Sequence, residues 1–164
     1  MKIISILSQK GGAGKTTIAL HLAVAAEQDG WQTAIIDLDP QASAASWGDS
    51  REAETPAVVS AQASRLTQVI DAARTAGAEL VIIDTAPHSE SAALAAARVA
   101  DLILIPCRPA ILDLRAIGNT IDLAKMAGKP AAVVLNAVPP RGSLADDASE
   151  AVAGYNMPIA PVHL

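Results

Sequence analysis

The chain has 164 residues, of which 51% are hydrophobic and 18% are charged. This composition is typical of one globular domain and excludes a disordered or collagen-like chain. The formal net charge of −5 supplies no overall basic field that would attract DNA or an anionic membrane. The single cysteine, Cys107, excludes an internal disulfide, a four-cysteine zinc site and an iron–sulfur cluster held by this chain alone.

Short apolar runs alternate along the chain with longer, alanine-rich segments of helical spacing. In chain order, this pattern predicts strand Ile3–Leu7, helix Thr16–Asp29, strand Thr33–Asp37, helix Ala42–Asp49, a weak strand Ala57–Ser60, helix Ser64–Ala76, strand Leu80–Asp84, helix Ser89–Ala100, strand Leu102–Pro106, helix Leu114–Ala127, strand Ala131–Asn136, helix Ala145–Ala153 and a short strand Met157–Val162. Asp113 is placed to cap the helix that follows it. The alternation predicts one α/β domain with a mostly parallel central sheet flanked by helices in three layers.

The segment Lys10–Thr17, with the sequence KGGAGKTT, follows a predicted strand and opens a predicted helix. This is the context of a phosphate-binding loop, in which glycines let backbone N–H groups turn inward around an anion. The helix N-terminus adds its partial positive charge. Lys15 is predicted to reach the β- and γ-phosphates, and the Thr16 hydroxyl to coordinate Mg²⁺. The loop residues predicted to contact the nucleotide are Gly11, Gly12, Ala13, Gly14, Lys15, Thr16 and Thr17.

Carboxylates end two of the predicted buried strands, where open α/β sheets place their ligands. Asp37 ends one strand, and Asp39 follows two residues later. Such groups can hold Mg²⁺ through water or orient an attacking water, although a pair of solvated loop aspartates is the alternative. Asp84 ends the run Leu80–Asp84, a Walker B pattern. Its carboxylate is predicted to accept a hydrogen bond from Mg²⁺-bound water or from Thr16.

The loop departs from the ordinary phosphate-loop pattern, which requires a glycine at position 9. This chain has Gln9 there, and a second lysine, Lys10, at the start of the loop. The segment thereby resembles the deviant Walker A motif of the ParA/MinD family of ATPases, and among them the small plasmid-partition proteins. Further motifs of the family match at Asp37–Gln41, Asp84–Pro87, Pro106–Leu114 and Asn136. Residues 1–164 are thus expected to form a single P-loop ATPase domain, without the C-terminal segment that family members normally add.

The resemblance implies a role for each matching residue. Lys10 would reach across a nucleotide-sandwich dimer to the partner's phosphates, Asp37 would lie near the magnesium shell, and Asp39 would position the hydrolytic water. Asn136 would hydrogen-bond the adenine edge, because its amide offers a donor and an acceptor; a turn-starting asparagine is the alternative. Pro158 lies where the base-covering loop of the family begins. The predicted catalytic residues are therefore Lys10, Lys15 and Asp39, and the predicted magnesium residues are Thr16, Asp37 and Asp84.

The resemblance further implies a cytoplasmic ATPase that uses ATP and Mg²⁺ and forms an ATP-dependent homodimer. It would drive plasmid or chromosome partition with a ParB-like adaptor, and turnover is expected to be slow without that partner. Non-specific DNA is a candidate partner, whereas a membrane is not expected because no basic amphipathic helix is recognised at the chain's end. Two other functions stay open: a related positioning ATPase of the MinD, chemoreceptor or conjugation type, and a nucleotide-gated binding module with negligible turnover.

Overall fold

The computed structural model describes residues 1–164, the whole chain. A single sheet of six strands has the order β3-β2-β4-β1-β5-β6, and all neighbouring strands are parallel. The strands are β1 Lys2–Ile6, β2 Thr33–Asp37, β3 Ala57–Ser60, β4 Leu80–Asp84, β5 Leu102–Cys107 and β6 Ala131–Leu135. Every residue of β2 and β4 is buried, as expected for apolar strands of a parallel sheet that is covered on both faces.

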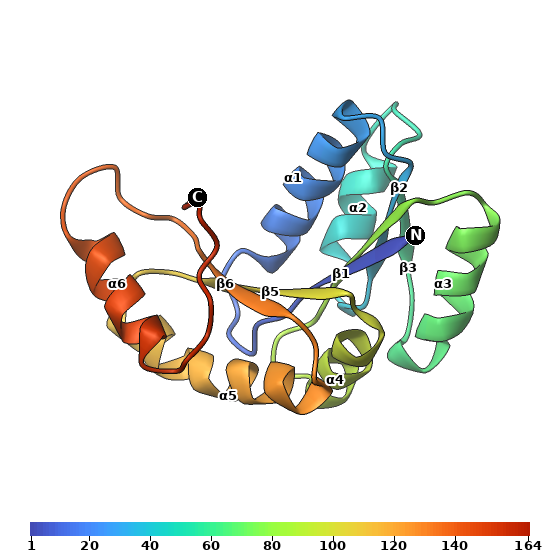
Figure 1. Ribbon diagram of the computed structural model, residues 1–164. Coiled ribbons are helices and arrows are strands. Elements are labelled where there is room, and N and C mark those ends of the chain that lie inside the picture. Colours follow the sequence, from blue (N-terminus) through green and yellow to red (C-terminus); the bar gives the residue numbers. More distant parts are fainter.

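Helices pack on both faces of the sheet and give the molecule three layers (Figure 1). They are α1 Lys15–Gln28, α2 Ser43–Asp49, α3 Leu66–Thr75 with the preceding 3-10 turn η1 Ala63–Arg65, α4 Glu90–Val99, α5 Ile111–Ala127 and α6 Leu144–Ala153. On the face covered by α1 and α2, Ile18 and Ala44 pack with the strand residue Ile35. The helices from α3 to α6 cover the opposite face, over a core of 24 buried residues. The predicted three-layer parallel α/β fold is confirmed.

The sheet register brings the predicted site residues to one edge. Asp84 at the end of β4 lies opposite Ile6 at the end of β1 and opposite Asp37 at the end of β2. Parallel strands share their carboxyl-terminal edge, and ligands of such sheets bind there. The chain leaves β1 at this edge and passes through the glycine-rich loop into α1. The loop and the two carboxylates are therefore neighbours because of the strand order.

The end of the chain differs from the predicted strand Met157–Val162. Only one bridge, between Val133 and Ile159, joins it to β6. Further along, the N–H of Leu164 donates to the carbonyl of Leu135. Prolines at two positions of this segment have no N–H group to donate, which limits its pairing. The C-terminal segment therefore lies along the edge of β6 without forming a regular strand.

The helix after β5 begins earlier than the sequence predicts. α5 starts at Ile111, so that Asp113 lies inside its first turn, and no side chain caps this helix. The prediction that Asp113 caps a helix beginning at Leu114 is wrong. Its carboxylate instead pairs with Lys10, a residue 103 positions earlier in the chain. None of the helices combines the length and the hydropathy needed to cross a membrane.

Candidate functional site

The loop between β1 and α1 carries a run of free hydrogen-bond donors. No backbone N–H group from Gly11 to Thr17 donates to an acceptor within the chain. Gly12 and Gly14 have φ values of 73° and 97°, a left-handed conformation that side chains disfavour and that turns successive N–H groups to the same side. The N-terminus of α1 follows at Lys15 and contributes partial positive charge. The loop can therefore surround an anion with several oxygen atoms.

Lys15 lies in this loop with only 6% of its surface exposed. Its Nζ donates to the carbonyl oxygen of Lys10 at 3.3 Å. Burial lowers the pKa of Lys15, and the charges of Asp84 and Asp39 act against that shift. An ammonium group with few partners in a partly desolvated site gains from a nearby anion. Lys15 is thus placed to bind the same phosphates as the N–H groups.

Asp84 is 1% exposed, and neither oxygen of its carboxylate has a hydrogen-bond partner. Burial raises its pKa to about 6, and the nearby Thr16 hydroxyl and the charge of Lys15 act against that shift. A buried carboxylate without donors is costly unless a cation or a bound water approaches it. Carboxylate and hydroxyl oxygens are the ligands that Mg²⁺ prefers. Asp84 and Thr16 therefore fit a magnesium ion that accompanies a bound phosphate.

The raised pKa of Asp84 predicts how a neutral replacement changes stability. The folded-state pKa of about 6 exceeds the ordinary value of 3.8. The protonated Asp84 side chain therefore stabilises the fold fully below pH 3.8, and this contribution to the free energy of unfolding is lost as the pH rises through 6. At pH 8 the charged carboxylate then costs the metal-free chain about 3 kcal/mol. We expect Asp84→Asn to raise the free energy of unfolding by about this amount at pH 8, and by much less at pH 4. Urea unfolding in EDTA measures the free energy of unfolding at both pH values. Destabilisation of Asp84→Asn at pH 8 would contradict the description of Asp84 as a buried carboxylate without hydrogen-bond donors.

Asp37 is fully buried, but its carboxylate is occupied by backbone donors. It accepts N–H groups from Asp39 at 2.9 Å, from Ala44 at 3.0 Å and from Ala45 at 3.1 Å. Two of these belong to the first turn of α2, whose N-terminal N–H groups lack partners within the helix. Asp37 thus holds the start of α2 against the end of β2. Sequence reasoning missed this role; its predicted position in the magnesium shell stays a prediction.

Asp39 leaves the same strand end and lies nearer to solvent, half-buried. Its Oδ1 accepts the N–H of Gln41 at 2.9 Å. It is close enough to Lys15 and Asp84 for its charge to raise the pKa of both groups. Asp39 is therefore a carboxylate beside the loop that still has a free oxygen. Its predicted contact with the hydrolytic water stays a prediction.

Asn136 joins the loop from the end of β6. Its Nδ2 donates to the carbonyl of Ala13 at 2.9 Å, and its Oδ1 accepts the N–H of Ala137 at 2.9 Å. A Cβ atom on Gly14 would lie 2.1 Å from this Nδ2, so that only glycine lets the amide approach the loop so closely. In this structure Asn136 holds the loop's main chain, and its predicted hydrogen bond to the adenine edge stays a prediction. The carbonyl of Pro158 accepts the N–H of Val133 in β6, and the predicted place of Pro158 in a base-covering loop stays a prediction.

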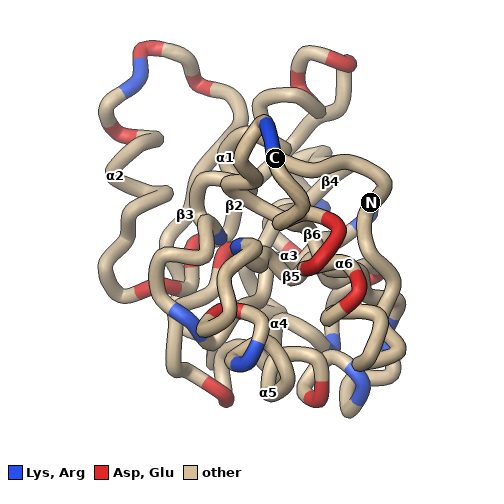
Figure 2. The backbone as a smooth tube through the Cα atoms, turned by 90° about the vertical axis from the view of Figure 1, so that its left-hand side faces the viewer, with Lys and Arg blue, Asp and Glu red and all other residues tan.

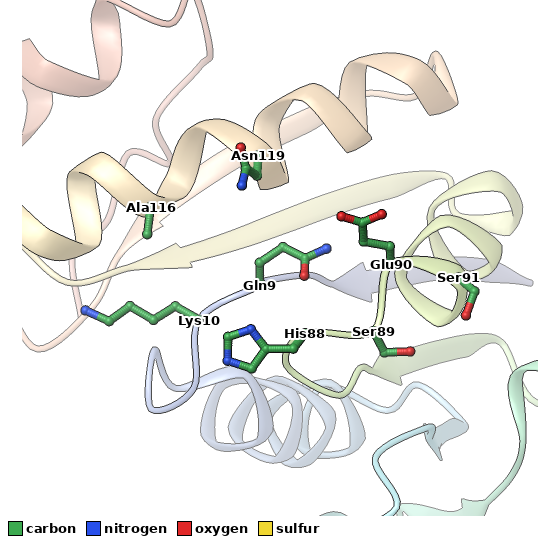
Figure 3. A pocket seen from close by; sticks show the side chains of 8 residues that line it. All are labelled: Gln9, Lys10, His88, Ser89, Glu90, Ser91, Ala116 and Asn119. Atoms are coloured by element: carbon green, nitrogen blue, oxygen red, sulfur yellow. The ribbon is translucent and has the colours of Figure 1, made fainter.

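A hollow of about 770 Å³ lies beside the loop. Figure 3 shows its lining, which comes from the loop, from the segment after β4 and from α5. The main chain of Gln9 joins these elements, because its N–H donates to the hydroxyl of Thr120 at 3.2 Å and its carbonyl accepts the N–H of His88 at 3.3 Å. The residue that replaces the usual glycine is therefore a junction between the loop, α5 and the segment after Asp84.

The comparison with protein families agrees with this geometry. The family described as CobQ/CobB/MinD/ParA nucleotide binding domain matches residues 4–162. The chain belongs to this family. The match covers the glycine-rich loop, both strand-end carboxylates and Asn136, and it confirms the predicted membership in the group that contains ParA and MinD.

Two relatives illustrate the range of the family. Maintenance of carboxysome distribution protein A of Gloeobacter kilaueensis is 34% identical over 143 residues, which are 85% of this chain and 65% of that protein. Chromosome partitioning protein ParA of Myxococcus xanthus is 29% identical in an alignment 201 residues long, which covers 94% of this chain and 71% of that protein. The chain therefore spans only part of the length of these relatives, less than two thirds of the first.

Solved structures share the fold at low sequence identity. Cobyrinic acid a,c-diamide synthase from Mycobacterium smegmatis, with bound ATP analogue and magnesium, has a TM-score of 0.82 at 17% identity, over 99% of this chain and 86% of that chain. The septum site-determining protein MinD of Pyrococcus horikoshii, complexed with Mg-ADP, has a TM-score of 0.74 at 19% identity, over 97% and 78%. These neighbours establish the P-loop ATPase fold of the ParA/MinD type, and they were crystallised with adenine nucleotides and magnesium.

Proposed function

We propose that the chain is a ParA-like ATPase that binds ATP with Mg²⁺ and forms a nucleotide-sandwich homodimer. One observation carries the proposal: the unpaired N–H groups from Gly11 to Thr17 lie beside the buried, unpartnered carboxylate of Asp84. The first feature suits an anion and the second suits a cation. A nucleoside triphosphate with its magnesium ion supplies both charges at once.

In this proposal the chain's residues have distinct tasks. The N–H groups of Gly11–Thr17 and the Lys15 ammonium bind phosphate oxygens. The Thr16 hydroxyl and Asp84 hold Mg²⁺, directly or through water, and when bound the ion neutralises charge on the phosphates. Asp37 holds the N-terminus of α2 against the end of β2, behind the site. Asp39, which retains a free oxygen, orients the attacking water.

Lys10 and the proposed partners act in the dimeric state. In the proposed sandwich, Lys10 of each copy binds phosphates on the other copy's nucleotide. A ParB-like adaptor and non-specific DNA are the partners of this state. In Figure 2, lysine and arginine segments are interspersed with acidic ones, and the net charge is −5, so a single chain is expected to bind DNA weakly. DNA binding that depends on ATP would follow from pairing two copies.

The cargo we favour is a plasmid or chromosome. One specific observation favours a second kind of cargo. The similarity to a carboxysome distribution protein favours a related ATPase that positions a protein compartment. Deleting the gene and counting cells that have lost the plasmid or the chromosome over many generations separates the two functions, because only the partition function predicts rapid loss of DNA. A nucleotide-gated module with negligible turnover is distinguished by measuring phosphate release with DNA and adaptor present.

Replacing Asp39 tests the proposed hydrolysis. We expect Asp39→Ala to bind Mg-ATP normally and to release phosphate at least about 100-fold more slowly, since a group that orients the nucleophilic water contributes about this factor. The matched control is Asp49→Ala, because Asp49 is exposed at the end of α2 and is expected to leave the rate unchanged. An Asp39→Ala protein that hydrolyses ATP at the wild-type rate would remove Asp39 from the mechanism.

A further inference from the structure

Lys10 forms an ion pair within its own chain. Its Nζ lies 2.6 Å from Oδ2 of Asp113, which is in the first turn of α5. The Asp113 side chain is 11% exposed and that of Lys10 is 37% exposed, so the pair is partly shielded from solvent and from screening by salt. Figure 3 shows Lys10 extended toward the N-terminal end of α5 and away from Glu90.

We propose that Asp113 is a positioning residue for Lys10, and that it holds the ammonium group within its own subunit until phosphates on a second copy replace the carboxylate. The inference rests on the proposed function, because the competing anion is the partner's nucleotide. Lysine carries a compact charge at the end of one flexible side chain, so it cannot serve both anions at full strength. Dimer formation with ATP must therefore break the pair, which raises the ATP concentration that dimerisation needs.

The main chain of Lys10 is also tied to the loop. Its carbonyl accepts the Lys15 ammonium at 3.3 Å, and its N–H donates to the hydroxyl of Ser8 at 3.3 Å. A phosphate that attracts Lys15 competes with this carbonyl, whereas the Lys10 side chain remains on Asp113. The two lysines are therefore expected to respond in sequence, Lys15 to nucleotide on its own chain and Lys10 to the approach of a second copy.

Cys107 is a built-in reporter of this pair. It is the only cysteine of the chain and is 2% exposed. A small space between the loop and α5 is lined by Cys107, Lys10 and Asp113 together. Release of Lys10 opens one wall of this space, and a thiol reagent then reaches Cys107 sooner. Burial, and after it the charge of Asp113, raises the pKa of the thiol to about 11, while the charge of Lys10 lowers that pKa.

These opposite charge effects make the labelling experiment decisive. Through charge alone, Asp113→Asn would lower the pKa of Cys107 and speed its reaction with a maleimide, whereas Lys10→Gln would raise the pKa and slow the reaction. Through release of the pair, both substitutions open the space. Without nucleotide, we expect each single variant to label about fivefold faster than wild type, the factor that a pair of about 1 kcal/mol supplies.

The double variant and two controls complete the test. Lys10→Gln combined with Asp113→Asn is expected to label no faster than either single variant, because both break the same contact. Asp113→Glu keeps a carboxylate and should restore slow labelling. Asp122→Asn alters an exposed carboxylate on the same helix and should label like wild type. Labelling of Lys10→Gln that is slower than wild type, or effects that add in the double variant, would overturn the proposal.

A second experiment joins the pair to dimerisation. Light scattering during an ATP titration with Mg²⁺ is expected to show Asp113→Asn dimers at about fivefold lower ATP than wild type. If both proteins dimerise at the same ATP concentration, the proposal for Asp113 is wrong while the ATPase function stands. If wild type binds no Mg-ATP, the proposed function fails, and the nucleotide-free labelling still decides whether Asp113 restrains Lys10.

Discussion

Changing Gly14 to alanine is expected to reduce Mg-ATP affinity at least about tenfold and to destabilise the fold, because two independent costs meet at this residue. Its φ of 97° costs an L-residue about 1–2 kcal/mol. The new Cβ would also lie 2.1 Å from Nδ2 of Asn136. Relief requires Asn136 to rotate and release the carbonyl of Ala13, a loss of about 1 kcal/mol. The loop then no longer holds its N–H groups in the phosphate-binding arrangement.

Gly11 provides the matched control in the same loop. A Cβ at Gly11 meets no heavy atom within 4 Å, and its φ lies outside the left-handed region. Gly11→Ala keeps the backbone N–H and is expected to bind Mg-ATP within about twofold of wild type, since neither strain nor a lost contact arises. Titration with a fluorescent ATP analogue and thermal unfolding measure both variants. Equal affinity for the Gly14→Ala protein and wild type would contradict the described loop geometry.

Replacing Lys15 with glutamine is expected to lower Mg-ATP affinity or turnover by about 100-fold or more, the usual loss when one preorganised charge at a phosphate site is removed. Stability should change in the opposite direction. Burial lowers the pKa of Lys15, which means that the folded chain disfavours the charged form, so at neutral pH the charge opposes folding. A neutral glutamine removes this cost.

The two readouts for Lys15→Gln separate function from folding. Thermal unfolding without nucleotide is expected to give a midpoint equal to or above that of wild type, while the fluorescent ATP analogue no longer binds. Lys129→Gln is the control. Lys129 lies in the connection between α5 and β6, away from the glycine-rich loop, and its replacement should leave nucleotide binding unchanged. If Lys15→Gln lost stability together with binding, the loss of binding would not identify Lys15 as a phosphate ligand.

The sequence predicts those parts of the fold that local patterns determine. The buried strands ending at Asp37 and Asp84 and the loop Lys10–Thr17 are placed correctly, because uninterrupted apolar runs and glycine-rich turns act over a few neighbouring residues. The parallel order of the sheet follows from alternating strands and helices. The loop and the two strand-end carboxylates then meet at one edge of the sheet as a consequence of this topology.

The contacts that refine the site could not be predicted in this way. Lys10 and Asp113 are 103 positions apart, and Asn136 and Ala13 are 123 positions apart. Such pairings depend on how α5 and β6 pack beside the loop, and no local signal encodes that. Asp113 had the sequence position of a helix cap, but a charged partner competes with capping.

The proposed nucleotide-sandwich dimer is tested by the solution mass of the Asp39→Ala protein, measured by light scattering with Mg-ATP and then with Mg-ADP. Because this variant is expected to bind ATP without hydrolysing it, the ATP-bound state persists during the measurement. We expect a dimer with Mg-ATP and a monomer with Mg-ADP. A monomer under both conditions, with nucleotide bound, would contradict the sandwich dimer.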